Sequence, residues 1–411
     1  MTNEREQRGL KIAALSKITK KGLVWLVPSQ SGKGKYTVSP DTEQPHCSCP
    51  DHETTGGKCK HIFAVEFVIQ RELFPDGTVA ETRSVTVSET VIRKPTYAQD
   101  WPAYNKAQTN EKSQLQVLLR DLLQGVDEPM VKAKRGNQPL KLRDAIFAAV
   151  FKVYSTVSGR RFMSDLRDAK EKGYISHAPC YNSIFNVLES EETTKVLLAL
   201  IAESAAPLKA IETKFACDSS GFSSSRFDRW FEHKWGEEVI KRAYVKAHVM
   251  CGVKTNVITA VEIAGPNAND NPMLPPMLAT TRQRFTVEEV SADMAYVGES
   301  NLQAIVDAGA TPLIPFKKNA TAAKGGLWAK CFHYFHYHRE EFLSRYHLRS
   351  NVETTFSMVK AKFGDSVRSK TDTAMKNEVL AKLLCHNICC LISATYELGI
   401  DPTFSSQSLA V

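Results

Sequence analysis

The 411-residue chain lacks several features that define whole classes of protein. Its first residues, Met1 to Arg8, are polar and charged, so the apolar stretch of a secretory signal is missing. No apolar run is expected to span a membrane, because the most apolar segment near the C-terminus contains His386 and Asn387. The ten cysteines do not form a regular disulfide framework. These absences predict a cytoplasmic protein with no membrane contact.

A large excess of charge of one sign is also missing. The net charge of +8 is modest, so it favours a polyanionic partner without identifying one. Nearly all of that excess can be assigned to residues 130–172, which hold eleven Lys or Arg and four acids. The composition is ordinary for a globular protein, and the length allows two or three domains.

Three of the cysteines and one histidine form a spaced group near the N-terminus. The group reads Cys47-Ser48-Cys49, then nine residues, then Cys59-Lys60-His61. Two predicted short strands, 22–27 and 35–39, precede it, and an apolar helix is predicted over 62–73. Three thiolates and an imidazole make a tetrahedral ligand set that suits Zn²⁺ and leaves no open position for catalysis. The neighbouring His46 and His52 are expected to face solvent.

This pattern resembles the SWIM zinc finger over about residues 20–73. The resemblance implies a structural zinc site in a module that contacts DNA or protein. Its ligands would be Cys47, Cys49, Cys59 and His61. We therefore predict a zinc-binding ββα module over residues 1–74. Residues 75–110 are predicted to be a linker, because their first part is rich in Thr, Val, Ser and Pro.

Residues 111–210 are predicted to be a helical region that binds DNA. The predicted helices are 111–124, 142–156, 161–172, 179–188 and 192–205. Two short helices joined by a turn that contains Gly173, within a basic stretch, fit a helix-turn-helix reader of duplex DNA. The side chains that would face the groove are Tyr181, Asn182, Ser183 and Asn186. The alternative is a solvated helical bundle.

Residues 211–400 change to a pattern of strands and helices, which predicts an α/β (α+β) fold. The predicted strands are 214–218, 244–249, 256–263, 286–292 and 311–316, and the predicted helices are 273–281, 299–308 and 376–398. Asp218 lies on the first strand and Asp293 at the end of the fourth. In a ribonuclease H-like mixed sheet these two strands are neighbours, so the two carboxylates can converge.

The stretch from Tyr346 to Lys360 is predicted to be one helix with two faces. At 100° per residue, Tyr346, Arg349, Glu353 and Lys360 fall within an arc of about 60°. An apolar stripe that contains Val352 lies beside that arc. One carboxylate among cations suits a site that handles phosphate. The alternative is an amphipathic helix with a mixed-charge outer face.

We predict that the closing helix lies across the two strands, so that Asp218, Asp293 and Glu353 meet. Three neighbouring carboxylates repel one another and need divalent cations to stay ionised. Oxygen ligands select Mg²⁺ or Mn²⁺, and two such ions would promote an in-line phosphodiester displacement. Each acid alone also has an ordinary structural explanation, as a turn residue, a strand end or a helix-surface charge.

These residues resemble the DDE transposases of bacterial insertion sequences, over about residues 140–400. Tyr346, Arg349, Glu353 and Lys360 match the spacing of the Tyr-Arg-Glu-Lys signature of one large group, and Ala292-Asp293-Met294-Ala295-Tyr296 is similar to the segment around its second aspartate. The resemblance implies a Mg²⁺- or Mn²⁺-dependent enzyme that cleaves DNA at element ends and joins the freed 3′-hydroxyl to target DNA. It implies DNA-phosphate contacts for Tyr346, Arg349 and Lys360. It also implies a homodimer or larger assembly, associated with the nucleoid in a bacterial cell.

Two alternative functions stay open beside this one. A domesticated, non-catalytic DNA-binding protein is disfavoured, because all three acids and the signature cations are present. A nuclease of the same core without strand transfer fits the sequence too. The aromatic and histidine run Cys331–His338 is predicted to be a packed or DNA-facing ridge beside the site, with metal binding as the less favoured alternative.

Overall fold

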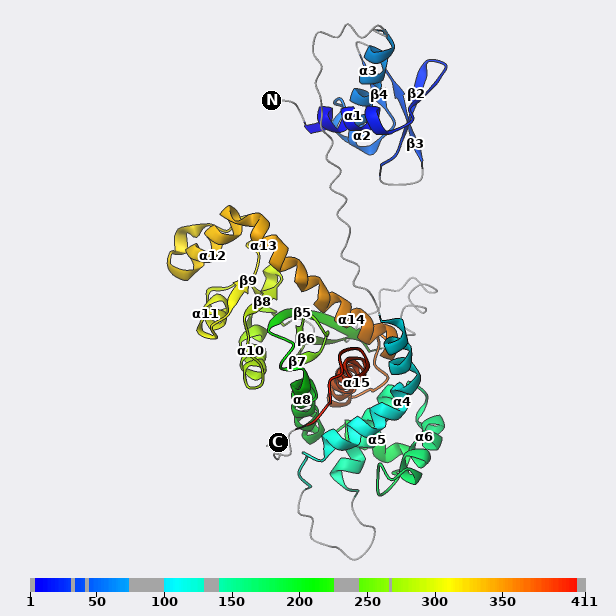
Figure 1. The fold of residues 1–411 in the computed structure, drawn as a ribbon, viewed down its shortest axis with the longest axis vertical. Helices are drawn as coiled ribbons and strands as arrows, with labels where there is room; N and C mark the ends of the chain where they lie inside the picture. The colour runs from blue at the N-terminus through cyan, green and yellow to red at the C-terminus, as the bar shows by residue number, and fades with distance from the viewer. Residues whose placement is uncertain are drawn as a thin grey trace, which may run out of the picture. The chain divides into compact units, whose positions relative to one another are not determined.

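The structure is a computed structural model that divides into two compact units, Met1–Thr96 and Tyr97–Val411. Each unit has its own hydrophobic core. Figure 1 shows both, with their elements labelled. The structure describes residues 4–30, 34–40, 44–73, 100–128, 140–224, 244–265 and 268–404.

The first unit is a four-stranded antiparallel sheet covered by helices. Its elements are α1 (Glu4–Leu15), β1 (Thr19–Lys21), β2 (Val24–Pro28), β3 (Lys35–Ser39), β4 (His46–Cys47), α2 (Pro50–Thr55) and α3 (Lys60–Leu73). The strand order is β1-β2-β3-β4. Helix α1 packs against α3 at Gly9, where a Cβ atom would lie 2.5 Å from the Phe63 Cβ. This close approach explains why the position needs glycine.

The predicted strands and helix of this unit are present as β2, β3 and α3, and the structure adds α1, β1, β4 and α2. The predicted ββα module was therefore too small. Helix α1 was missed because its first five residues are all charged or polar, yet Ile12 is fully buried in the core of the unit. Packing of Gly9 and Ile12 on the rest of the unit stabilises this helix, as tertiary contacts do for most short helices.

The second unit begins with five helices. They are α4 (Trp101–Leu123), α5 (Leu142–Ser155), α6 (Gly159–Glu171), α7 (Tyr181–Leu188) and α8 (Glu191–Ala205). Residues 101–110, predicted to belong to a linker, are the start of α4. The Asp100 side chain caps this helix by accepting a hydrogen bond from the Ala103 amide, and Ala107 is buried. The remainder of the predicted linker, apart from Asp100, lies outside the described residues.

A five-stranded mixed sheet follows, in the order β7-β6-β5-β8-β9. Its strands are β5 (Lys214–Ser223), β6 (Tyr244–Gly252), β7 (Ile258–Ala264), β8 (Glu289–Ala292) and β9 (Thr311–Leu313). The first three strands pair antiparallel, whereas β8 pairs parallel with both β5 and β9. The α/β prediction is confirmed, and the sheet is consistent with a ribonuclease H-like core.

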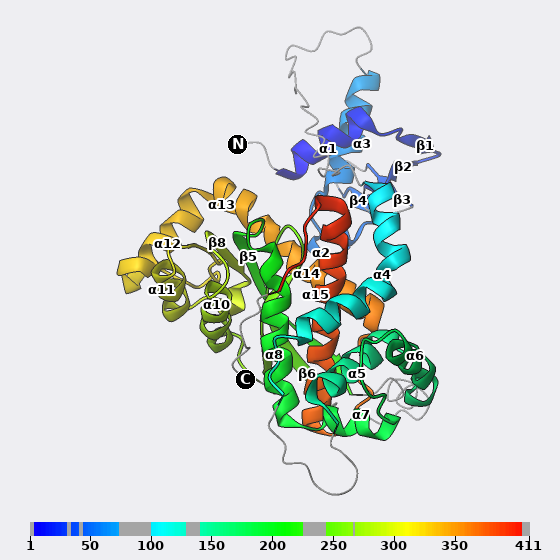
Figure 2. The ribbon, with the colours of Figure 1, turned by 60° about the horizontal axis from the view of Figure 1, so that its bottom comes forward.

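Helices connect the later strands and close the unit. They are α10 (Leu274–Arg282), η3 (Met294–Tyr296), α11 (Glu299–Asp307), α12 (Gly326–Tyr337), α13 (Arg339–Tyr346), η5 (His347–Arg349), α14 (Ser350–Phe363) and α15 (Asp372–Leu398). Figures 1 and 2 show α15 between the sheet and the helices α4 and α5, all of which it contacts.

Helix α15 is long and apolar enough, by length and composition, to cross a membrane, contrary to the sequence-based prediction. However, 83% of its apolar window is buried inside the protein, as in a core helix. Its polar side chains hold neighbouring backbone: Asn387 donates to the Ile258 carbonyl at 2.7 Å, and His386 Nε2 lies 2.9 Å from the Asn256 carbonyl. Burial lowers the pKa of His386 to about 4, so this ring is neutral inside the core.

Candidate active site and metal cluster

The first two acids of the candidate site lie on adjacent parallel strands. The β5–β8 register pairs Cys217 with Ala292, and each is followed directly by an aspartate, Asp218 or Asp293. Paired residues of neighbouring strands are about 5 Å apart. This register therefore places the two aspartates side by side at the point where β8 ends. The predicted adjacency of the two strands is confirmed. The Asp293 carboxylate also accepts a hydrogen bond from the Ala295 amide at 2.7 Å, which fixes the turn that follows β8.

The third acid, Glu353, reaches the site through an arginine. The Arg349 guanidinium donates to Asp218 Oδ2 at 3.0 Å and also to Glu353 Oε1, one turn further along the chain. A single planar cation therefore lies between two of the three acids. We call Asp218, Asp293, Glu353 and Arg349 the carboxylate edge.

Burial raises the pKa of Asp218, and the nearby charge of Asp293 raises it further. The Ser219 amide and the Arg349 guanidinium oppose this shift. The Asp218 side chain is 19% exposed, so the ion pair with Arg349 is partly shielded from water. The Asp218 and Asp293 carboxylates thus repel each other, and a neighbouring cation stabilises their charged forms.

The signature tyrosine and lysine flank the carboxylate edge on different helices. Tyr346 ends α13, stacks on Phe342 at 5.7 Å and lies beneath the Arg349 guanidinium. Burial raises the pKa of Tyr346, and the Arg349 charge opposes the rise. On α14, Lys360 Nζ donates to Ser220 Oγ at 2.7 Å, on the same face of β5 as Asp218. Burial lowers the pKa of Lys360.

The predicted continuous helix from Tyr346 to Lys360 was wrong. The turn η5 separates α13 from α14, so Tyr346 and Lys360 belong to different helices. Arg345 holds the end of α13 by a double hydrogen bond to Glu289 on β8, at 2.9 and 3.1 Å. This bond ties α13 to the sheet. The backbone keeps right-handed helical angles at Tyr346, Arg349 and Ser350, so the interruption is a single 3₁₀ turn in the helical path.

In the first unit, the four predicted zinc ligands form a compact buried cluster. Their ligand atoms all lie within 4.8 Å of one another, and His61 Nδ1 lies 3.9 Å from both the Cys47 and Cys59 sulfurs. The hydrogen bond between the two thiols raises the pKa of Cys47 and lowers that of Cys59. Within the part of the chain that the structure describes, no other set of three or more such ligands is gathered this closely.

Comparison with known protein families agrees with both sites. Residues 210–388 match the family described as Transposase DDE domain, and residues 36–70 match the SWIM zinc finger. The chain carries a transposase DDE domain and a SWIM zinc finger. The predicted resemblance is thereby confirmed. No curated protein and no solved structure matches the chain.

The matched ranges contain the three acids, the signature residues and the four zinc ligands, but not the candidate groove-facing residues of α7. The DDE domain includes the carboxylate edge with Tyr346 and Lys360, and the SWIM finger includes the four-ligand cluster. Of the histidines near that cluster, His46 is exposed as predicted, but His52 is buried. Its Nδ1 lies 2.8 Å from the Gly57 carbonyl, so His52 holds the loop between the ligand pairs.

Several residues that support the DDE domain were not singled out from the sequence. Tyr296 is fully buried behind Asp293, with its hydroxyl 3.0 Å from His248 Nδ1. Asn301 donates to the Tyr296 carbonyl at 2.9 Å. Together these contacts hold the turn η3 and hence the position of Asp293. Tyr296 follows Asp293 by three residues, which is the only sequence signal for this role.

The helical region ahead of the DDE domain keeps its predicted order of short helices. The Asp144 carboxylate on α5 accepts hydrogen bonds from the Ser176 and His177 amides, which fixes the segment before α7. On α7, Asn182 and Asn186 are exposed, whereas Tyr181 and Ser183 are half-buried. The unpredicted neighbour Phe185 is 41% exposed on the same helix.

The run Cys331–His338 lies mainly on α12 and forms the predicted aromatic ridge. Phe335 and Trp328 pack around Phe316 after β9, while Tyr337 is 78% exposed and stacks on His333. These rings pack against one another. Among the described residues, the histidines and the cysteine of this run do not form a cluster of metal ligands.

Proposed function

We propose that this protein is a DNA transposase that cleaves DNA at element ends and joins the freed 3′-hydroxyl to target DNA. The observation that supports this most is the parallel β5–β8 pairing, which sets Asp218 beside Asp293, with Glu353 linked to Asp218 through Arg349. The matched DDE domain covers all of these residues.

We assign Asp218, Asp293 and Glu353 as ligands of two Mg²⁺ or Mn²⁺ ions. The donor set contains only carboxylate oxygens, which fits hard divalent cations. When bound, such ions activate the attacking oxygen and stabilise the leaving oxygen of an in-line phosphodiester displacement. The role of the three acids would be to hold and orient the ions. Asp293 would do so from a turn that its hydrogen bond with the Ala295 amide fixes.

Arg349 and Lys360 would bind the DNA backbone beside the cut, with Tyr346 packed under the arginine. Arg349 already has its fork directed at oxygen anions, and a phosphate offers the same geometry as the carboxylates that it now contacts. Lys360 would supply a point charge further along β5. The basic helical region, with Asn182 and Asn186 exposed on α7, is the second DNA-contacting surface.

The SWIM finger would hold one structural Zn²⁺ on Cys47, Cys49, Cys59 and His61. The four ligand atoms are buried and already close together, and a closed shell of three sulfurs and one nitrogen suits zinc. Substitution of Cys59 by Ser should reduce the bound zinc, measured by atomic emission on the purified protein. Unchanged zinc stoichiometry would overturn this assignment.

We further propose that the protein acts in the cytoplasm, on the nucleoid in a bacterial cell, as a dimer or larger assembly. Two element ends must be processed together for an element to move, and the paired DNA substrates call for at least two catalytic domains. Light scattering of the protein with end DNA would test this, since a complex with only one copy would contradict it.

The experiment that tests the function combines purified protein, Mg²⁺, target DNA and DNA that carries the inverted repeats flanking the gene. A transposase releases a 3′-hydroxyl at the repeat end and then yields joined products. Cleavage without joining would instead identify a nuclease, and binding without cleavage a non-catalytic DNA-binding protein. Asp218→Asn should abolish both products, and products that persist in this variant would overturn the catalytic assignment.

A further inference from the structure

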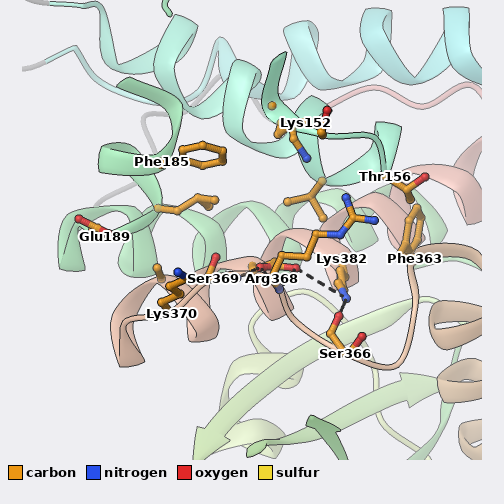
Figure 3. A pocket seen from close by; sticks show the side chains of 16 residues that line it. Lys152, Thr156, Phe185, Glu189, Phe363, Ser366, Arg368, Ser369, Lys370 and Lys382 are labelled. Carbon is orange, nitrogen blue, oxygen red and sulfur yellow. Dashed lines mark hydrogen bonds and ion pairs between the residues drawn. The ribbon is translucent and has the colours of Figure 1, made fainter. Parts of the chain in front are cut away.

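A pocket of about 340 Å³ lies in the second unit, away from the three acids of the carboxylate edge. It is enclosed by α5, α6 and α7 on one side and by residues 364–371, which connect α14 to α15, on the other (Figure 3). Its cations are Lys152, Arg368, Lys370 and Lys382, and its acids are Glu189 and Glu378. We call this site the basic pocket.

Lys152 is the unusual residue of the basic pocket. It is 8% exposed, and among the described residues no hydrogen bond or ion pair reaches its Nζ. Its side chain extends from α5 into the pocket, on the side where Arg368 lies (Figure 3). Burial and, to a lesser extent, the Arg368 charge lower the pKa of Lys152 to about 8, and the Glu378 charge opposes this shift. A largely buried cation that faces a pocket and has no ion-pair partner is costly, and an anion in the pocket would reduce this cost.

The acid nearest to Lys152 is already engaged elsewhere. The Glu378 carboxylate accepts hydrogen bonds from the Arg368 and Ser369 amides at 2.8 to 3.0 Å. Lys382 lies 3.9 Å from Glu378 and donates to the Ser366 carbonyl at 2.6 Å. These contacts fix residues 366–369, and among the described residues they leave Lys152 without an ion pair of its own, although the Glu378 charge acts on it. The Arg368 guanidinium contacts only a backbone carbonyl, that of Val157 at 3.3 Å, among the described residues.

Aromatic rings line the basic pocket beside these cations. Phe185 and Phe363 lie on opposite sides of it in Figure 3. Phe185 packs on Gly159, where a Cβ atom would lie 2.8 Å from its ring. Glycine therefore allows Phe185 to lie close to the start of α6. An exposed ring next to cations is a surface on which a nucleic-acid base can stack.

The backbone at the rim of the basic pocket is strained. Thr156 ends α5 with a φ of 56°, in the left-handed region that β-branched residues rarely adopt. Its neighbours Val153 and Ser158 line the same pocket. Strain of this kind is often found at binding sites, where the surrounding structure maintains it.

Two elements connect the carboxylate edge with the basic pocket, since α14 reaches both and β5 contacts the segment that lines the pocket. Beyond Asp218, strand β5 continues to Ser223, which exchanges hydrogen bonds with the backbone of Asp365 and Val367 at 3.1 and 2.9 Å. Ser223 lies five positions beyond Asp218 on the strand, a rise of roughly 17 Å. Helix α14 carries Glu353 near its start and Phe363 at its end. A DNA strand that passes the acids can therefore reach the pocket within a few nucleotides.

We propose that the basic pocket binds one unpaired nucleotide of the DNA strand, with its phosphate on Lys152 and Arg368 and its base against Phe185 and Phe363. This inference rests on the proposed DNA-cleaving function. The pocket volume suits a single small ligand, and it can accept a base only when that base is outside a duplex. The cations would bind the phosphate by charge, and the two phenylalanine rings would bind the base by stacking.

The test measures binding to the full-length protein by calorimetry in EDTA, so that no divalent ion is needed. The probes are inorganic phosphate, thymidine 5′-monophosphate, a short single-stranded oligothymidylate and a duplex of the same length. Lys152→Met should weaken single-strand binding roughly ten- to hundredfold, as expected for loss of a charged hydrogen bond. Phe185→Ala should weaken thymidylate binding about tenfold while leaving phosphate binding unchanged.

Controls separate this proposal from misfolding and from failure of the proposed function. Lys209→Met removes an exposed lysine outside the pocket and should bind all probes like the wild type. Lys152→Met should be at least as thermally stable as the wild type, because it removes an unpaired buried charge. Asp293→Asn should bind thymidylate normally even though cleavage fails. Three results would overturn the proposal. The first is equal single-strand binding by Lys152→Met and the wild type. The others are binding of the duplex as tight as that of the single strand, and binding of phosphate without binding of thymidylate.

Discussion

The carboxylate edge and the basic pocket treat charge in opposite ways. At the edge, one guanidinium, that of Arg349, contacts both Asp218 and Glu353. At the pocket, the Lys152 ammonium is buried, and no ion pair with a described carboxylate reaches it. Arg349 at the first site thus has carboxylate partners, whereas Lys152 at the second has no ion-pair partner among the described residues.

This difference has a consequence for ligand binding. A divalent cation or a phosphate that enters the edge must replace an existing ion pair, so binding there is an exchange of partners. An anion that enters the basic pocket replaces nothing and relieves the cost of a buried charge. We therefore expect the basic pocket to bind the nucleotide before the ion pairs of Arg349 at the carboxylate edge are broken. This binding should need no metal ion.

The largest effect should follow removal of charge at the edge. Asp293→Asn keeps an oxygen that can accept the Ala295 amide, so the turn is preserved and only the charge is lost. We expect single-turnover cleavage to fall at least about a thousandfold, as for loss of an essential catalytic group. Thymidylate binding in the basic pocket should not change. Cleavage within about tenfold of the wild type would contradict the role of Asp293.

The next largest effect should be a pH-dependent stability at the basic pocket. The pKa of Lys152 is lowered from 10.5 to about 8 by folding, so the unfolded chain binds more protons between these values. Stability contributed by this group therefore rises as pH increases from about 8 to 10.5. Below pH 8, Lys152→Met should be more stable than the wild type by about 3 kcal/mol, and this advantage should vanish by about pH 10.5.

Denaturant unfolding at a series of pH values measures this difference. Both proteins keep every other charged side chain of the pocket, Arg368, Lys370, Lys382, Glu189 and Glu378, so the difference between them reports Lys152 itself. A difference between the two proteins that does not vary with pH would show that the Lys152 ammonium already has a partner.

A smaller effect should follow substitution of the cation at the edge. Arg349→Ala should slow cleavage about thirtyfold, near 2 kcal/mol, because a bidentate phosphate contact is lost. Arg349→Lys should retain part of the rate, since it keeps the charge but not the fork. Rate constants under single-turnover conditions would measure both. If the lysine variant is no faster than the alanine variant, the charge of Arg349 has no role of its own.

The smallest effect should come from the strained residue at the pocket rim. Thr156→Gly should stabilise the protein by about 1 kcal/mol, because glycine adopts a φ of 56° without strain. Thermal unfolding would measure this, with Thr109→Gly, inside α4, as a destabilising control. A loss of stability in Thr156→Gly would mean that the threonine side chain compensates for its own strain.

Local patterns in the sequence predicted much of this molecule. The zinc ligands lie within one short segment, Cys47 to His61, so their spacing alone predicts the site. The order of strands and helices predicts Asp218 on the first strand and Asp293 at the end of the fourth. What joins those two acids is a pairing across 75 residues of chain, and the resemblance to a family supplied it before the structure did.

Contacts made across the fold could not be predicted in the same way. The bridge from Arg349 joins Glu353, four residues along the chain, to Asp218 on a strand 131 positions earlier, and no local pattern shows such a contact. Lys152 was counted with the other basic residues of its stretch as a surface charge for DNA. It is buried only because α5 packs against residues that follow α14, some two hundred positions later.

Helix α14 links the two sites as a rigid spacer. Glu353 and Phe363 are ten residues apart on it, a rise of about 15 Å. If a nucleotide is held at one end and cut at the other, the helix fixes how many nucleotides separate the anchored position from the broken bond. The position of the cut would then be set by the length of a protein helix as well as by the sequence of the DNA.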